Sequence, residues 1–205
     1  MRTSVRESPA AAILSMFQHV TVLVSFIFAI ALTHVFSSAS QLILARERVR
    51  FSWLLSVSMV NAALGVIINW LSLWSLQNLK QWSLTEVLLQ LGWVIPNYFS
   101  CSLVAMPCSE SGPLDMAAYF ARQRRVIFSA TLALAAMSGL ANYVDRNNFE
   151  SWKPNEWISA ELVGLSLGVF AVLAGWGKPR WLQWVGVGGM LVQNVWYFVF
   201  YTLGP

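Results

Sequence analysis

The stretch AAILSMFQHVTVLVSFIFAIALTHVF, residues 11–36, contains no Asp, Glu, Lys or Arg. A membrane-spanning α-helix needs about 20 predominantly apolar residues, so this stretch is long enough to cross a bilayer. It also exceeds the apolar core of a secretory signal, roughly 7 to 15 residues, and we expect it to persist as a helix. The basic segment RERVR, residues 46–50, follows it and indicates a membrane boundary.

The rest of the chain repeats this pattern. Of 205 residues, 57% are hydrophobic and 11% charged, against roughly 25% charged in a soluble domain, which excludes a soluble protein. We predict an all-α, polytopic membrane helix bundle that forms a single domain over residues 1–205. About six transmembrane helices are expected, over residues 11–44, 51–74, 82–107, 126–144, 157–177 and 181–203. Three helices followed by three would give halves of opposite orientation, the arrangement of an inverted repeat.

The segment between the third and fourth predicted spans differs from the other loops. Asp115 is a helix-capping residue type, and Tyr119 and Phe120 follow it at helical spacing. Arg124 and Arg125 make the end of this segment basic. A helix with apolar residues and a basic end is typical of a membrane surface, so a short surface helix is predicted over 115–125.

Basic residues indicate the orientation of the bundle. Short loops rich in Lys and Arg stay in the cytoplasm. The loops after the first, third and fifth predicted helices hold eight of the 13 basic residues: Arg46, Arg48, Arg50, Arg122, Arg124, Arg125, Lys178 and Arg180. Both termini are therefore predicted to lie outside. The formal net charge is +4, but the basic residues lie between apolar runs, so nucleic acid is not expected as a partner. We expect six arginines at the membrane boundary to contact lipid headgroups or a partner protein: Arg46, Arg48, Arg50, Arg122, Arg124 and Arg125.

Polar residues within the apolar runs are the candidates for a binding site. Counting from the span ends places Asn61, Asn97, Gln193 and Asn194 near the middle of the membrane and His34 toward the inner side. Glu161 shares a helical stripe with small residues, and an ionisable group on a packing face indicates a functional site. The alternatives are amides that only hydrogen-bond between helices and a boundary carboxylate that complements a helix dipole.

These residues favour a protein that binds or passes a small uncharged solute through an outward-facing polar vestibule. The second hypothesis is an accessory or assembly subunit of a larger membrane complex. Besides membrane lipids, the expected partners are a second copy of this chain in a homo-oligomer or the subunits of such a complex. A haem or quinone redox protein is a third, although His19 and His34 lie about 22 Å apart by helical rise and do not hold one iron together. The sequence has no His-Glu-x-x-His motif, and its one G-x-S-x-G match, residues 164–168, lies inside the predicted apolar span 157–177. The serines lie at helix-packing spacings, so no enzyme, metal or cofactor is predicted.

A resemblance covers about the first 125 residues. The run Ala31, Leu32, Thr33 and His34, the basic segment before Trp53, and the segment with Tyr119, Phe120, Arg124 and Arg125 resemble a group of small, uncharacterised multi-pass proteins of the bacterial inner membrane. The resemblance implies a location in the inner (cytoplasmic) membrane of a bacterium. It implies no activity.

Overall fold

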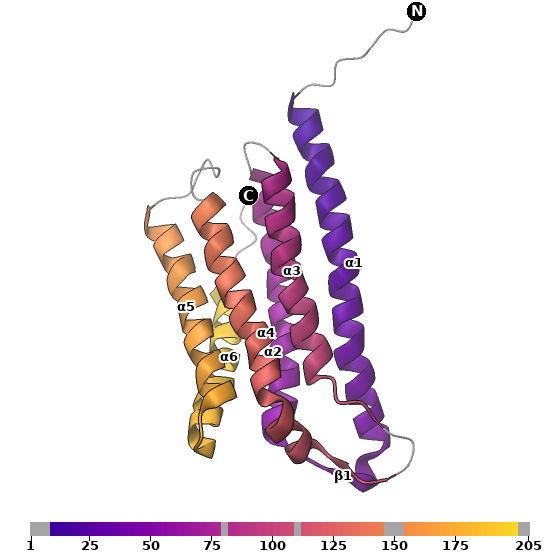
Figure 1. Ribbon diagram of the computed structural model, residues 1–205. Coiled ribbons are helices and arrows are strands. Elements are labelled where there is room, and N and C mark those ends of the chain that lie inside the picture. The colour runs from indigo at the N-terminus through magenta and orange to yellow at the C-terminus, as the bar shows by residue number, and fades with distance from the viewer. Residues whose placement is uncertain (1–8, 79–81, 109–111, 146–153, 201–205) are drawn as a thin grey trace, which may run out of the picture.

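The computed structural model describes residues 9–78, 82–108, 112–145 and 154–200, and this part of the chain forms six α-helices (Figure 1). They are α1 (Pro9–Leu44), α2 (Trp53–Ser72), α3 (Leu84–Val104), α4 (Met116–Asp145), α5 (Pro154–Trp176) and α6 (Arg180–Phe200). Two 3₁₀ helices, η1 (Arg46–Arg48) and η2 (Leu73–Asn78), follow α1 and α2. The predicted all-α class is confirmed.

Four of the helices are long and apolar enough to cross a membrane. These segments are Met16–Leu44, Trp53–Gln77, Leu84–Val104 and Met116–Val144, and a shorter apolar helix covers Ala160–Trp176. Large apolar side chains also face outward, including Phe26 on α1 (66% exposed), Leu165 on α5 (66%) and Val192 on α6 (69%). Large exposed apolar patches mark contact with a membrane or a partner. The count of six crossings stays a prediction.

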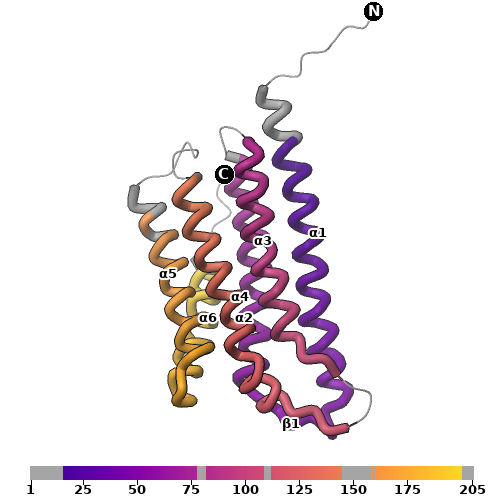
Figure 2. The backbone as a smooth tube through the Cα atoms, viewed as in Figure 1, coloured from indigo at the N-terminus to yellow at the C-terminus, as the bar shows by residue number. Residues whose placement is uncertain are grey.

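Consecutive helices run in opposite directions, so the loops alternate between the two ends of the bundle (Figure 1; the chain path is followed in Figure 2). The loops that carry Arg46, Arg48, Arg50, Lys178 and Arg180 therefore share one end with the start of α4, and we call this the basic end. There, the two-residue strands β1 (Val49–Arg50) and β2 (Leu114–Asp115) pair in parallel, with Val49 opposite Leu114.

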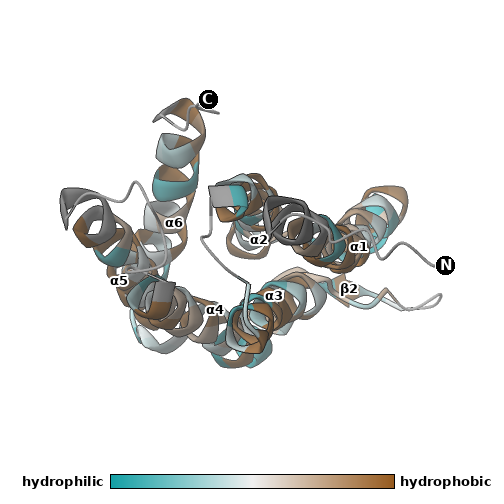
Figure 3. Cartoon of the chain, turned by 90° about the horizontal axis from the view of Figure 1, so that it is seen from above, coloured by the Kyte–Doolittle hydropathy of each residue, from teal (hydrophilic) through white to brown (hydrophobic). Residues whose placement is uncertain are grey.

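Helices α2 to α6 form a closed ring, seen end-on in Figure 3. Each packs against the next along the chain, and α6 closes the ring by packing against α2. Helix α1 lies outside the ring, against α2 and α3. The predicted inverted repeat is not confirmed: α1 and α4 would correspond in it, yet only α4 belongs to the ring.

The separate surface helix predicted over 115–125 is wrong, because these residues continue into the predicted span 126–144 as the single helix α4. The Asp115 carboxylate accepts a hydrogen bond from the Ala118 N–H at 2.8 Å and so starts the helix, and no proline interrupts it. Met116 and Phe120 are buried in the protein core instead of facing a membrane surface. The Tyr119 hydroxyl donates to the Leu103 carbonyl at 2.8 Å.

Small residues bring α4, α5 and α6 close together. A Cβ atom on Gly175 of α5 would lie 3.1 Å from the Cβ of Phe128 on α4. A Cβ on Gly186 of α6 would lie 2.5 Å from the Ala174 nitrogen of α5. The glycines of α5, Gly164, Gly168 and Gly175, therefore pack inside their own bundle, against α4. Helix α6 packs against α5 through its own glycines, Gly186 and Gly189. This close packing is typical of membrane helices.

Candidate functional site

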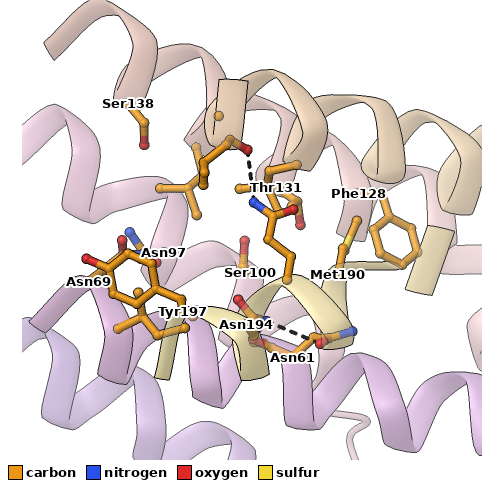
Figure 4. Close-up of a pocket in the computed structure, with 18 of the residues that line it drawn as sticks. Asn61, Asn69, Asn97, Ser100, Phe128, Thr131, Ser138, Met190, Asn194 and Tyr197 are labelled. Atoms are coloured by element: carbon orange, nitrogen blue, oxygen red, sulfur yellow. Dashed lines mark hydrogen bonds between the residues drawn. The ribbon is translucent and has the colours of Figure 1, made fainter. Parts of the chain in front are cut away.

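A cavity of about 180 Å³ lies in the centre of the helix ring (Figure 4). All five ring helices contribute to its wall, and none of the described residues that line it is charged. Its polar lining consists of amides and hydroxyls: Ser58, Asn61, Asn69, Ser72, Asn97, Ser100, Thr131, Ser138, Gln193, Asn194 and Tyr197. The predicted polar layer of Asn61, Asn97, Gln193 and Asn194 thus converges on one cavity.

Asn61 and Asn194 join α2 to α6 across the cavity wall. The Asn194 side-chain amide donates to the Asn61 Oδ1 at 3.2 Å, and the Asn61 amide donates in turn to the Val187 carbonyl at 2.8 Å. Asn61 is buried, and these bonds satisfy its oxygen and one of its amide hydrogens. This pair therefore closes the ring as well as lining the cavity.

Asn97 holds the adjoining wall. The Asn69 amide donates to the Asn97 Oδ1 at 2.7 Å, and the Asn97 amide donates to the Trp93 carbonyl at 3.1 Å. The Trp93 indole donates to the Ser138 hydroxyl at 2.9 Å. Pro96 has no N–H to donate, so the helix turn beside Asn97 has one backbone bond fewer. Polar side chains thus connect α2, α3 and α4 in a continuous chain.

Gln193 joins α6 to α5 in the same way. Its amide donates to the Val163 carbonyl at 2.9 Å, and its Oε1 accepts a hydrogen bond from the Ser166 hydroxyl at 3.2 Å. All four predicted amides therefore form hydrogen bonds between helices, as expected if they serve only to hold the bundle together. All four also border a cavity, which a purely structural role does not require.

Among the described lining residues, Ser100 has a buried hydroxyl without a hydrogen-bond partner. It is 8% exposed, and its Oγ is buried without a hydrogen bond in the described part of the chain. A buried hydroxyl without a partner costs free energy. Ser100 was not among the predicted site residues. The sequence feature that points to Ser100 is its position one helical turn after Asn97, on the same face of a helix that also contains Pro96.

The cavity is closed at the basic end. There its wall consists of Val104, Ile127 and Phe128, which are 2%, 1% and 3% exposed. At the opposite end its described lining residues, Ser72 and Tyr197 among them, are only partly buried. The described side chains therefore leave the cavity more accessible from the end away from the basic loops.

Two ionisable residues predicted for this site lie elsewhere. Glu161 lines a separate hollow between α4 and α5, where its Oε2 would lie 3.3 Å from a Cβ on Gly139. Its Oε1 is buried without a hydrogen-bond partner among the described residues. His34 lies at the α1–α3 contact, with its Nε2 3.3 Å from the Tyr98 hydroxyl. A helical stripe shows which residues share a face but not which neighbour that face meets, and this is why both were misplaced.

The predicted basic residues have different surroundings at the basic end. Arg50 pairs with Asp115 at 3.2 Å, and Arg124 donates to the Gly177 carbonyl at the end of α5 at 2.6 Å. The Ala118 N–H and the Arg50 guanidinium lower the pKa of Asp115, although its partial desolvation opposes them. Arg46, Arg122 and Arg125 are exposed. No group of three or more His, Cys, Asp or Glu side chains gathers within the described ranges.

The chain matches none of the protein-family models, curated proteins or solved structures with which it was compared.

Proposed function

We propose that this protein is an integral membrane protein that binds a small uncharged polar solute in its central cavity and passes it across the membrane. In this proposal all six helices cross the inner membrane of a bacterium, and the basic end faces the cytoplasm. The cavity is then reached from outside. The alternation of basic loops supports this orientation, and the resemblance noted in the sequence supports the location.

The chemistry of the cavity wall carries the proposal. A charged solute needs an opposite charge to offset its desolvation, and the described lining offers none. The wall instead offers amide and hydroxyl groups, including the unpartnered hydroxyl of Ser100. These groups both donate and accept hydrogen bonds, as a polyol or an amide solute requires.

The volume of the cavity limits the size of this solute. An engineered apolar cavity of about 150 Å³ holds one benzene molecule, and the cavity here is of similar size, about 180 Å³. A solute of a few carbon atoms therefore fits. We take glycerol as the probe, because it is uncharged and has three hydroxyl groups.

Gly65 offers a direct way to block the cavity. It lines the cavity, and a Cβ added to it would meet no atom within 4 Å. A leucine at this position would therefore extend into the cavity. Gly188 on α6 is a matched control, since a Cβ there also meets nothing within 4 Å but the residue does not line the cavity.

The test measures glycerol entry into proteoliposomes by stopped-flow light scattering. We expect faster entry with the wild-type protein than with empty liposomes, a rate near that of empty liposomes for Gly65→Leu, and a wild-type rate for Gly188→Leu. Thermal unfolding of each variant checks that it is folded. Equal glycerol entry with wild-type protein and with folded Gly65→Leu would contradict the proposal.

The hollow that contains Glu161 favours a second candidate function, that of a subunit in a larger membrane complex. This hollow opens on the side of the bundle between α4 and α5, and its lining is apolar apart from Glu161. A buried carboxylate oxygen without a described partner is a group that a donor on a neighbouring helix would satisfy. Purification in mild detergent distinguishes the candidates: a stoichiometric partner lost in Glu161→Leu would support the subunit, and a protein that purifies alone would contradict it.

A further inference from the structure

An apolar groove runs along the outside of the bundle between α1 and α2. It has a volume of about 550 Å³, roughly three times that of the central cavity, and it does not share lining residues with that cavity. Its walls include Phe36, Ala39, Ile43, Phe51, Met59 and Val60. Phe36, Ile43, Phe51 and Val60 are each about half exposed or more, so the groove is open along its side.

The groove has a charged end. Arg46 lines it at the basic end, directly after α1. Phe36 lies ten residues earlier, which is about 15 Å along the helix, and the walls between them are apolar apart from Ser56. Polarity therefore changes along the groove from a cation at the predicted membrane boundary to hydrocarbon deeper in the bundle.

Arg46 is available to bind a ligand. It is exposed, and no hydrogen bond or ion pair links its guanidinium to another residue in the described part of the chain. Arg50, four residues later, is paired with Asp115 instead. Glu47 directly follows Arg46 in η1, but no ion pair joins the two.

From these features we infer that the groove is a binding site for one anionic phospholipid. An acyl chain lies between α1 and α2, and the headgroup phosphate of the lipid pairs with Arg46. Arginine suits this role because its guanidinium donates two parallel hydrogen bonds to phosphate oxygens. Basic pockets between helices on the cytoplasmic side of a membrane are known to select anionic headgroups. This inference does not rest on the central cavity or its solute.

The charge of the headgroup decides between lipid classes. Phosphatidylglycerol and phosphatidylethanolamine with the same acyl chains would bury the same apolar area in the groove. Only phosphatidylglycerol has a net negative charge, because the ammonium of phosphatidylethanolamine offsets its phosphate. A preference between the two therefore measures the contribution of the cation, and retention of both measures the contribution of the apolar walls.

The experiment is native mass spectrometry of the full chain with these two lipids, each carrying palmitoyl and oleoyl chains. We expect one tightly held phosphatidylglycerol per protein, about fivefold preferred over phosphatidylethanolamine, which corresponds to ~1 kcal/mol for one arginine at an anionic surface. Arg46→Ala should abolish the preference. Arg46→Lys, which keeps the charge but not the two parallel hydrogen bonds, should keep only part of it. Ala39→Phe, which fills the groove, should reduce the retention of both lipids.

Arg125→Ala is the matched control, because Arg125 is an exposed arginine at the same end that does not line the groove. It should leave the preference unchanged. An equal loss in Arg46→Ala and Arg125→Ala would show a diffuse effect of surface charge and overturn the site. No preference for phosphatidylglycerol in the wild-type protein would also overturn it. Since Arg46 is exposed and unpaired among the described residues, its variants are expected to fold, and thermal unfolding verifies this.

Discussion

Replacing Gly186 with alanine tests how closely α5 and α6 approach. A Cβ on Gly186 would lie 2.5 Å from the Ala174 nitrogen and 2.6 Å from the Phe170 carbonyl oxygen. Both are backbone atoms, so no side-chain rotation relieves the clash. Carbon atoms pack without strain at about 3.5 Å, and the two helices would therefore have to separate by roughly 1 Å.

The net effect is the difference between two opposing terms. Alanine stabilises a helix by about 1 kcal/mol relative to glycine. Overpacking typically costs about 1–3 kcal/mol and occasionally more, and a backbone clash belongs at the upper end of this range. We therefore expect Gly186→Ala to lower the free energy of unfolding by about 2 kcal/mol, or the Tm by about 4–8 °C on the scale measured for chains of this size.

The assay is thermal unfolding in detergent, followed by the fluorescence of the 11 tryptophans. Gly188→Ala is the control on the same helix, because its added Cβ meets no atom within 4 Å, and it should be neutral or slightly stabilising. If Gly186→Ala and Gly188→Ala unfold at the same temperature, the backbones of α5 and α6 do not approach closely at Gly186, and the reasoning is refuted.

Three further predictions concern the basic end and the cysteines. Arg124→Ala should lower the stability by about 1 kcal/mol, because its guanidinium donates to the carbonyl of Gly177, the residue directly after α5, whereas Arg125→Ala should have no measurable effect on Tm. Because the pKa of Asp115 is lowered in the folded protein, its carboxylate stabilises the fold fully when the pH is above 3.8, the ordinary pKa of an Asp. This stabilisation is lost as the pH falls through the lower pKa of the folded state. The difference in Tm between wild type and Asp115→Ala should therefore be largest at neutral pH and vanish in acid. Iodoacetamide should alkylate the partly exposed Cys108. The rate should still be rising at pH 9, the ordinary pKa of a thiol, because burial raises the pKa of Cys108 more than Arg48 lowers it. The fully buried Cys101 should stay unmodified until the protein is denatured, as measured by peptide mass spectrometry.

The sequence was sufficient to predict the helices and to find the four amides that line the central cavity. Runs of apolar residues separated by basic loops predict the helices and the end on which each loop lies, because both depend on local composition. The amides Asn61, Asn97, Gln193 and Asn194 were found because polar side chains inside an apolar run must face protein.

The remaining features depend on which helices meet, and local composition does not contain that information. Glu161 was placed with the amides, but its face of α5 packs against α4 outside the cavity. The start of α4 was assigned to a surface helix because arginines follow it, yet a helix continues through a charged turn when nothing breaks it. Gly65 shares a helical stripe with Asn61 and Asn69 in the sequence, but the empty space beside it is seen only in the structure.

The most direct test of the central claim is solute protection of a cysteine in the cavity. Gly65→Cys, in a chain with Cys101 and Cys108 changed to serine, places a thiol in the cavity, and Gly188→Cys in the same chain places one outside it. Both are labelled with methyl methanethiosulfonate, a small uncharged thiol reagent, with and without molar glycerol. We predict that glycerol slows the labelling of Gly65→Cys and leaves that of Gly188→Cys unchanged. A thiol at position 65 that stays unlabelled, or whose labelling glycerol does not slow, would contradict a solute-binding cavity.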